Sequence, residues 1–287
     1  MSEKRIGVIG GSGLYDMEGL EVVEKTEITT PFGSPSDAFT IGRLAGREVV
    51  FLPRHGEGHR LLPGELPFRA NIWGMKKLGV DWIMSVSAVG SMKESLAPRE
   101  VVFPDQFIDR THHRSDTFFG DGVVAHIGFA DPVCSDLSEC MAVAAVTCDA
   151  TVHRGGTYVC IEGPAFSTRA ESRLYRSWDV DVIGMTNYQE AKLAREAGIC
   201  YATMACITDY DCWHETEESV TVQMLIENLQ HNSALAQEAI REAVRTLPDQ
   251  RECQCGKALE NAILTPPDLI PKETKLRLEI IIGDYIE

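Results

Sequence analysis

Long apolar runs are missing from this sequence. None approaches the roughly 20 residues that a membrane-spanning helix requires, and the opening MSEKRIGVIGG lacks the apolar core and cleavage site of a secretory signal. Basic residues are also scarce: 27 Lys and Arg stand against 43 Asp and Glu, for a formal net charge of −16. Nucleic-acid surfaces require clustered Lys and Arg. We therefore expect a cytoplasmic protein without a membrane or nucleic-acid partner.

Paired CxxC clusters are absent among the nine cysteines, and this absence argues against zinc. Cys160, Cys200 and Cys206 lie in apolar runs, so we expect inert core residues. Cys253 and Cys255 flank one residue in a polar tail. A disulfide across so short a span would be strained and easily reduced, which favours two free thiols in a mobile tail.

Internal repeats and Gly/Ser linkers are absent as well. The 287 residues, 44% hydrophobic and 24% charged, suit a globular protein. Composition shifts only near residues 248–255. We expect a single domain over residues 1–287 with a C-terminal extension from about residue 248. Its end, LRLEIIIGDYIE, is apolar enough to dock on the domain or on another subunit.

Apolar runs and helical patterns alternate along the chain. The runs predict strands at residues 6–9, 48–52, 81–88, 100–103, 158–161, 180–183 and 199–207. Helical patterns occupy residues 69–78, 136–148, 168–178, 189–196 and 219–247. Ser135 and Asp136 suit an N-cap, and Thr168 with Glu171 has capping-box spacing. The alternation predicts an α/β fold with a mixed or parallel central sheet flanked by helices.

The first predicted strand runs into Gly10-Gly11-Ser12-Gly13. Backbone N–H groups of such a turn can converge on an anion. The turn is no dinucleotide fingerprint, because Asp16 stands at the third glycine position. It is no nucleophile elbow either, because Leu14 replaces the second glycine. The glycine turn is therefore equally consistent with a phosphate site and with a plain tight turn.

The second strand ends in Pro53-Arg54-His55-Gly56-Glu57-Gly58-His59. An arginine fork binds phosphate bidentately, and His55 adds a hydrogen-bonding group. The two histidines have metal-motif spacing, but Gly56 and Gly58 disfavour the helix that such a motif needs. A surface loop with solvated histidines is the alternative.

Small or polar residues also follow other strands. Taken singly, each such run is more typical of a packed strand end or a solvated turn. The most informative pair is Asp209 and Asp211, which alternate along an extended segment and so point the same way. In α/β sheets, ligands lie beyond the carboxyl ends of strands. A carboxyl group at an apolar strand mouth can act as an acid.

Together these runs resemble the methylthioadenosine phosphorylases of the trimeric purine nucleoside phosphorylase superfamily. The resemblance extends from about residue 6 to residue 225 and rests on GVIGGSGL, RHGEGH, AVGSM, EGPAFSTRAES, AKLAREAGICYA and TDYDCWHETEESV. It implies a mixed sheet flanked by helices and a homotrimer with active sites at subunit interfaces. The implied activity is that of a pentosyltransferase: 5′-methylthioadenosine and phosphate give adenine and 5-methylthioribose 1-phosphate. Phosphate is a co-substrate, and neither cofactor nor metal is implied.

The resemblance also implies roles for individual residues. Asp209 would protonate the leaving purine, and Asp211 would accept from its 6-amino group. The phosphate would be surrounded by Ser12, Arg54, His55, Ser87, the backbone N–H of Ala88, and Thr186. The nucleoside would contact Phe166, Ser167, Met185, His59 and a 5′ pocket of Val222, Leu225, Leu264 and His126, the last lent by a neighbouring subunit.

The sequence also departs from the animal enzymes of this family. Ser12 and Ser87 replace Thr but keep the hydroxyl, Gly184 replaces Asn, and Gln189 replaces Pro. The CxC tail is similar to that of heat-loving archaeal relatives that use disulfides, and Cys134, Cys200 and Cys206 lie at or near cysteines of those relatives.

Several functions compete with this one. Phosphorolysis of 5′-deoxyadenosine or 5′-methylthioinosine uses a similar site. A non-catalytic nucleoside-binding module would keep the fold but would be free to lose Asp209. A serine hydrolase built on Ser12 fits poorly, because the elbow glycine is missing.

Overall fold

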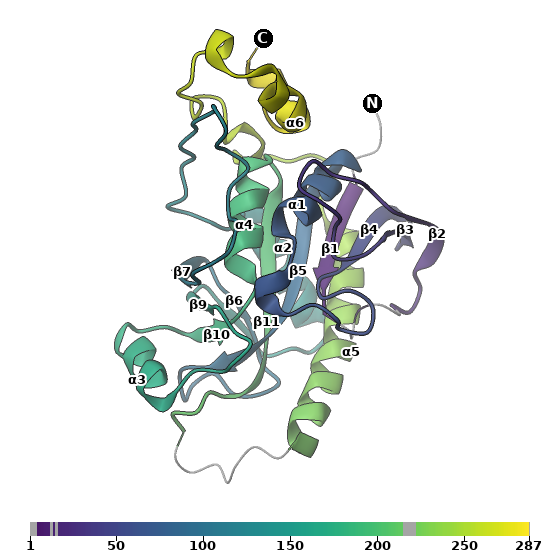
Figure 1. Ribbon diagram of the computed structural model, residues 1–287. Coiled ribbons are helices and arrows are strands. Elements are labelled where there is room, and N and C mark those ends of the chain that lie inside the picture. Colours follow the sequence, from purple (N-terminus) through teal and green to yellow (C-terminus); the bar gives the residue numbers. More distant parts are fainter. Residues whose placement is uncertain (1–4, 12–13, 15–16, 215–221, 287) are drawn as a thin grey trace.

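The computed structural model describes residues 5–11, 14, 17–214 and 222–286, and for residues 222–226 it describes only the backbone. A single mixed sheet forms the centre of the molecule (Figure 1). Its main path runs in the order β2 (Glu21–Thr26), β3 (Phe39–Leu44), β4 (Arg47–Pro53), β1 (Arg5–Gly10), β5 (Val80–Ser91), β10 (Val182–Gly184), β9 (Thr157–Ile161) and β7 (Gln106–Arg110).

The long strand β5 organises the sheet. It pairs in parallel with β1 on one side and with β11 (Cys200–Tyr210) on the other, and its last residues pair antiparallel with β10. Strand β11 in turn pairs antiparallel with β6 (Val101–Phe103), which pairs in parallel with β8 (Val152–Arg154). The predicted mixed sheet is therefore confirmed.

Helices cover both faces of the sheet. Helices α2 (Ser135–Thr147) and α5 (Val222–Thr246) pack on one face, in one hydrophobic cluster with β1, β5 and β11. Helices α1 (Phe68–Lys77), α4 (Asn187–Glu196) and α6 (Lys272–Ile282) contribute to a second cluster. Helix α3 (Arg169–Ser177) lies at the opposite end of the molecule from α6 (Figure 1).

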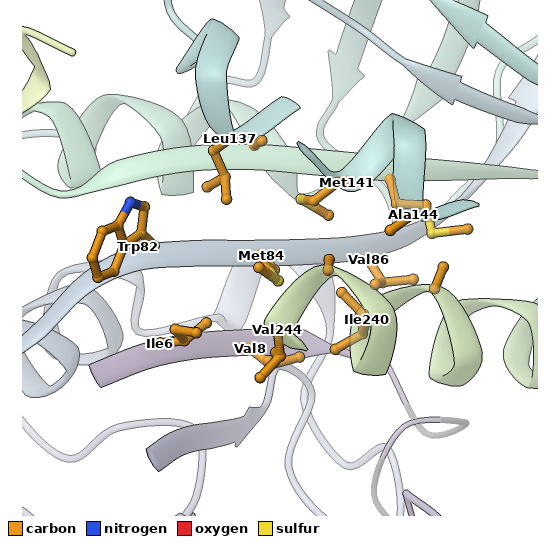
Figure 2. Close-up of a cluster of buried hydrophobic side chains, with 14 of the residues drawn as sticks. Ile6, Val8, Trp82, Met84, Val86, Leu137, Met141, Ala144, Ile240 and Val244 are labelled. Carbon is orange, nitrogen blue, oxygen red and sulfur yellow. The ribbon is translucent and has the colours of Figure 1, made fainter. Parts of the chain in front are cut away.

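Alternation along the strands explains why they read as continuous apolar runs. In β5, Trp82, Met84 and Val86 point into the first cluster, where Figure 2 shows them between α2 and α5, while Ile83 points into the second. Side chains alternate across a strand, so a sheet covered on both faces needs apolar residues at successive positions. Each fully buried large side chain contributes about 1.5–3 kcal/mol.

All seven predicted strands and all five predicted helices are present, with shifted ends. Strand β10 begins two residues later than expected, and α4 two residues earlier. Helix α3 has the expected cap, because Thr168 and Glu171 form a reciprocal capping box. The expected cap of α2 was wrong: Cys134 is the N-cap and Ser135 is already helical. In the described ranges, four strands and an α-helix escaped prediction, namely β2, β3, β7, β8 and α6.

The C-terminal segment packs on the body of its own chain. Leu278 and Ile282 of α6 are fully buried in the second cluster, which also holds Ile72 of α1. Cys253 and Cys255 are free thiols, as expected, but the expectation of a mobile tail was wrong, because Cys255 is buried and belongs to the first cluster. None of the helices in the described ranges combines the length and apolarity needed to span a membrane.

Candidate active site

Several of the predicted site residues lie where the parallel strands β1, β4, β5 and β11 end. The backbone N–H of Arg54, just after β4, donates to the carbonyl of Gly10 at the end of β1, at 2.9 Å. Gly10, which opens the glycine turn, therefore lies beside Arg54. Ser12 within that turn falls outside the described residues.

Arg54 is buried and held by the protein itself. Its Nε and Nη2 atoms lie 2.5 and 3.0 Å from the two carboxylate oxygens of Glu190, so the bidentate partner of this guanidinium is Glu190. Nη2 also lies 2.6 Å from Ser85 Oγ, and Nη1 donates to the carbonyl of Val86 at 2.8 Å. A guanidinium has five N–H groups. The expected bidentate grip on phosphate does not fit this arrangement, because the described residues leave a single Nη1–H of Arg54 without an acceptor.

A buried polar network continues from this ion pair. Glu190 also accepts hydrogen bonds from the hydroxyls of Ser85 and Tyr201, at 3.0 and 2.9 Å. Asn187 Nδ2 lies within 3.0 Å of the Ser85, Tyr201 and Thr203 hydroxyls. Hydrogen bonds that polarise one another in this way hold the buried groups in place, although Asn187 Oδ1 has no partner among the described residues. Sequence reasoning missed Glu190 and Asn187, because polar residues in a helix read as its solvent face.

His55 is held as a neutral ring. Its Nδ1 lies 2.8 Å from the carbonyl of Leu61, and its ring stacks on His59 with centroids 4.2 Å apart. Burial lowers the pKa of His55 to about 4, although the Leu61 carbonyl opposes this shift. Neutral His55 therefore carries its proton on Nδ1 and presents Nε2 as an acceptor.

Two predicted hydroxyl groups are unused by the described residues. Ser87 Oγ is buried and makes no hydrogen bond of good geometry with the described residues, although the Tyr158 hydroxyl lies beside it. Thr186 is buried at the N-cap of α4, and its side chain makes no capping bond. Buried polar groups normally have partners, and helix N-termini favour anions. These two groups are therefore suited to an anion. Ala88, next to Ser87, is exposed.

Tyr158 accounts for the glycine at position 184. A Cβ atom added to Gly184 would lie 1.9 Å from the Tyr158 hydroxyl oxygen, so this hydroxyl occupies the space of a side chain at position 184. Burial raises the pKa of Tyr158, while the nearby charge of Arg54 opposes the rise. The Tyr158 oxygen also lies beside Ser87 and the backbone of Thr186. Tyr158 was not among the predicted site residues.

Asp209 and Asp211 lie together over the end of β5. A Cβ atom added to Gly90 would lie 3.4 Å from Asp209 Oδ1 and 3.5 Å from Asp211 Cβ, which confirms that the two aspartates share one side. The Thr208 hydroxyl donates to Asp209 Oδ2 at 2.7 Å. An irregularity in the pairing of β11 with β5 falls between Ile207 and Asp209. Such irregularities often redirect side chains beside active sites.

Ser167 and Phe166 lie on the loop before α3. Ser167 Oγ lies 2.9 and 2.7 Å from the two carboxylate oxygens of buried Asp211, so it is oriented together with that carboxylate. Phe166 is 81% exposed, so it does not cover the core as most loop aromatics do. An aromatic ring left this open is available to stack on a flat ligand.

Arg114, also missed by sequence reasoning, fixes the backbone at Met185. Its side chain is 1% exposed and contacts the carbonyls of Met185, Ile161 and Glu162 at 2.5, 3.2 and 2.6 Å. It also bonds the side chain of Gln189, where the animal enzymes have proline. One guanidinium thus joins three segments on which predicted site residues depend.

The predicted 5′ pocket is not assembled within the described part of one chain. The side chains of Val222 and Leu225 lie outside the described residues, and His59 is exposed. His126 and Leu264 are both exposed and flank an antiparallel bridge between Ala125 and Ile263. That bridge lies close to α6, because the neighbouring Asp121 binds Arg277. In Figure 1, α6 lies far from the carboxyl ends of β1 and β11.

The fold and these strand ends define a class. Residues 5–245 match the family model of the phosphorylase superfamily, so the chain belongs to that superfamily. Among its curated relatives, the S-methyl-5′-thioadenosine phosphorylase of Geobacter sulfurreducens is 62% identical over 99% of this chain and 100% of its own length. The protein of the same name from Koribacter versatilis is 57% identical over 99% and 97%.

Solved structures show the same likeness. A methylthioadenosine phosphorylase from an Antarctic soil metagenomic library superposes with a TM-score of 0.93, at 49% identity over 98% of this chain and 99% of that chain. A variant of the adenosine/methylthioadenosine phosphorylase of Schistosoma mansoni, in complex with methylthioadenosine, gives a TM-score of 0.83 at 35% identity, over 89% and 95%.

Proposed function

We propose that this protein is a 5′-methylthioadenosine phosphorylase, a pentosyltransferase that releases adenine and 5-methylthioribose 1-phosphate. One observation carries the proposal beyond its superfamily: Asp209 and Asp211 lie together over Gly90, at the carboxyl end of β5. Two carboxyl groups match the N7 acceptor and the 6-amino donor of adenine, when one is protonated and the other is not. The names of the relatives agree with this substrate.

Phosphate binds at the ends of β1, β4 and β5. The hydroxyls of Ser12, Ser87 and Thr186, the Ala88 N–H and the remaining Nη1–H of Arg54 donate to it. His55 accepts, so the bound phosphate carries a proton that points to His55 Nε2. Local donors and the N-terminus of α4 thus hold an anion on an acidic protein.

Base departure leaves positive charge on the sugar, and the bound phosphate faces that charge and then captures it. Asp209 donates its proton to N7, Asp211 accepts from the 6-amino group, Phe166 stacks on the purine, and the Met185 N–H meets the ribose 2′-hydroxyl. Positioning, electrostatics and leaving-group protonation are sufficient, so neither a covalent nucleophile nor a cofactor takes part.

The 5′ pocket is completed in a homotrimer located in the cytoplasm. Val222, Leu225 and His59 come from one subunit. Because His126 and Leu264 flank the same bridge, a neighbouring subunit supplies both of them, whereas the sequence suggested only His126. Aliphatic walls favour a methylthio group, since a buried 5′-hydroxyl would lose its hydrogen bonds.

The first test is base release, with and without phosphate, from 5′-methylthioadenosine, 5′-deoxyadenosine, adenosine, 5′-methylthioinosine and inosine. We expect phosphate-dependent adenine release, fastest from 5′-methylthioadenosine. If adenine were released fastest from 5′-deoxyadenosine, the 5′ pocket would prefer a deoxy group to a methylthio group. Preferred release of hypoxanthine would contradict the roles of the aspartates, and no turnover at all would favour a binding module.

Replacing single carboxyl groups tests the mechanism. Asp209→Asn removes the acid, and we expect kcat for 5′-methylthioadenosine to fall by about 10²-fold or more. Asp211→Asn keeps the acid but replaces an acceptor-only carboxylate with an amide that can also donate to a 6-oxo group, so selectivity should move towards 6-oxopurines. Unchanged adenine release by Asp209→Asn would exclude it as the acid.

Mixed trimers test the shared site. An Asp209→Asn chain and a chain carrying His126→Ala and Leu264→Ala should each be weakly active. Their co-expression should restore activity, because some sites then combine Asp209 from one chain with His126 and Leu264 from another. Light scattering should show three chains, and mixtures no more active than their components would contradict the exchange.

A further inference from the structure

Four cysteines from three separate segments converge on one point. Cys134 precedes α2, Cys200 begins β11, and Cys253 and Cys255 lie in the C-terminal segment. Their four Sγ atoms all lie within 4.8 Å of one another, and Cys200 Sγ lies 3.2 Å from Cys253 Sγ. The phosphorylase reaction proposed above uses none of them. Cys200 is a buried core residue, as expected, and the fold places three other thiols around it.

We propose that Cys134, Cys200, Cys253 and Cys255 bind one zinc ion, which joins the C-terminal segment to the sheet. Zinc takes four thiolates in a tetrahedron with Zn–S bonds of about 2.3 Å, which sets the sulfur atoms about 3.8 Å apart. The cluster is close to that size. Its sulfur atoms are too near one another to surround an iron–sulfur core.

A tetrad also fits zinc better than it fits disulfides. Two disulfides need two separate pairs of sulfur atoms, whereas each sulfur atom here is close to all three others. Spacing along the chain hid the site, because sequence reasoning looked for paired CxxC motifs. Only Cys253 and Cys255 are close in sequence, and the fold supplies the other two ligands.

The surroundings can hold such an ion. Cys134, Cys200 and Cys255 are buried, while Cys253 is partly exposed and leaves a route for the metal. The loop that carries the last two ligands is fixed by its neighbours: Arg251 donates to the Gly198 carbonyl at 2.7 Å, and Tyr285 to the Gly256 carbonyl at 3.1 Å. Supporting contacts of this kind orient metal ligands.

Groups near the cluster can partly offset the negative charge of a zinc–thiolate centre. Four thiolates and one zinc ion carry a net charge of −2 after four protons leave. Cys134 is the N-cap of the 13-residue helix α2, and helix N-termini stabilise negative charge. The Arg251 guanidinium, which also pairs with Asp81 at 3.3 Å, lies 2.9 Å from the position of a Cβ atom on Gly256, next to Cys255. A zinc–thiolate centre is therefore compatible with this acidic protein.

The position of the cluster indicates a structural role. Beyond Cys255 the chain continues through the bridge at Ile263 to α6. Binding energy at a structural zinc site contributes directly to folding. The ion would therefore stabilise the C-terminal segment, including the proposed neighbour-facing Leu264. Only this last consequence rests on the proposed function.

Metal content tests the proposal. Untagged protein, purified in reducing buffer and without chelator, should contain about one zinc ion per chain by mass spectrometry of the elements. Cys253→Ser should lose nearly all of it and still fold, because Cys253 lies partly at the surface. The matched control is Cys148→Ser, a partly buried thiol at the C-cap of α2, and it should keep its zinc.

A second measurement reports on the ligands directly. Cobalt added after zinc removal should give the intense visible bands of a tetrahedral thiolate complex in the parent and in Cys148→Ser, but not in Cys253→Ser. Zinc removal should also increase hydrogen exchange in residues 250–287. Metal-free protein with four reactive thiols would overturn the proposal. A mass of the intact protein that is lower by two hydrogens for each disulfide would also overturn it, because the four cysteines would then form disulfide bonds instead of a metal site.

Discussion

The phosphate side and the base side of the proposed site are built differently. On the phosphate side, Arg54 and Glu190 are each 2% exposed and belong to a network of buried hydrogen bonds. On the base side, Phe166 is 81% exposed, and its neighbour Ser167 holds Asp211 from a loop. One half is fixed by the sheet within a single chain, and the other half is open.

This difference matches the ligands that we propose. Phosphate is small and does not vary, so preformed donors can hold it with little reorganisation. A nucleoside must enter and its base must leave, and loops on a rigid scaffold allow that exchange. Changes on the phosphate side should therefore affect folding strongly, and changes on the base side should mainly affect substrate binding.

The strongest test of this contrast removes one charge from the buried pair. Glu190→Gln leaves the Arg54 guanidinium buried without its counter-charge, and the free energy of unfolding should fall by about 3–5 kcal/mol. The control Glu139→Gln breaks the Arg154–Glu139 pair, whose side chains are 47% and 57% exposed; it should change stability by about 1 kcal/mol or less. Urea unfolding measures both, and equal effects would refute the contrast.

The pH dependence of stability should expose the buried histidine. Because the pKa of folded His55 is about 4 instead of 6.5, the unfolded chain binds more protons, and stability is lost as pH falls from 6.5 to 4. Burial raises the pKa of Glu196 to about 7, so its contribution is lost as pH rises from 4.5 to 7. Each contribution amounts to about 3 kcal/mol, and they oppose each other.

In Glu196→Gln, the free energy of unfolding should therefore fall between pH 6.5 and 4 because of His55. In the parent protein the two contributions oppose each other, so its free energy of unfolding should change little over the same range. Unfolding free energies at half-unit pH steps, at fixed protein concentration, would show it. The exposed Glu57→Gln should keep the parent profile. A flat profile for Glu196→Gln would mean that His55 is not held neutral.

Adding a side chain at position 184 should lower stability by a smaller amount. Gly184→Ala places a methyl group against the Tyr158 hydroxyl, and such overpacking costs about 1–3 kcal/mol. It should also raise KM for phosphate, because Ser87 and Thr186 adjoin Tyr158. In a double-mutant cycle, Tyr158→Val should relieve part of the defect of Gly184→Ala. Purely additive effects would show that the two positions do not compete for space.

The smallest effect on stability is expected on the base side. Ser167→Ala removes a hydroxyl from a loop and should lower stability by about 1 kcal/mol or less. Asp211 then loses the group that orients it, so KM for 5′-methylthioadenosine should rise several-fold while KM for phosphate stays constant. Steady-state kinetics with each substrate varied in turn would decide. A larger change in the phosphate KM would show that the halves are coupled.

The sequence by itself determined most of the framework. Apolar runs predicted buried strands such as β5 and β11, and Thr168 with Glu171 predicted the start of α3. Both signals depend only on residues a few positions apart in the sequence. The exposed β2, with Val22 and Val23 open to solvent, carries no such run and was missed. Strand ends bearing Arg54, His55 and Asp209 were found for the same local reason.

Only the tertiary structure decided which groups meet. The partner of Arg54 lies 136 residues away at Glu190, and Tyr158 fills the space beside Gly184 from a neighbouring strand. The four cysteines join segments separated by more than 50 residues. Local patterns record whether a residue prefers to be buried. They do not record its partner, because partners are set by strand order, register and helix packing, which the whole chain settles together.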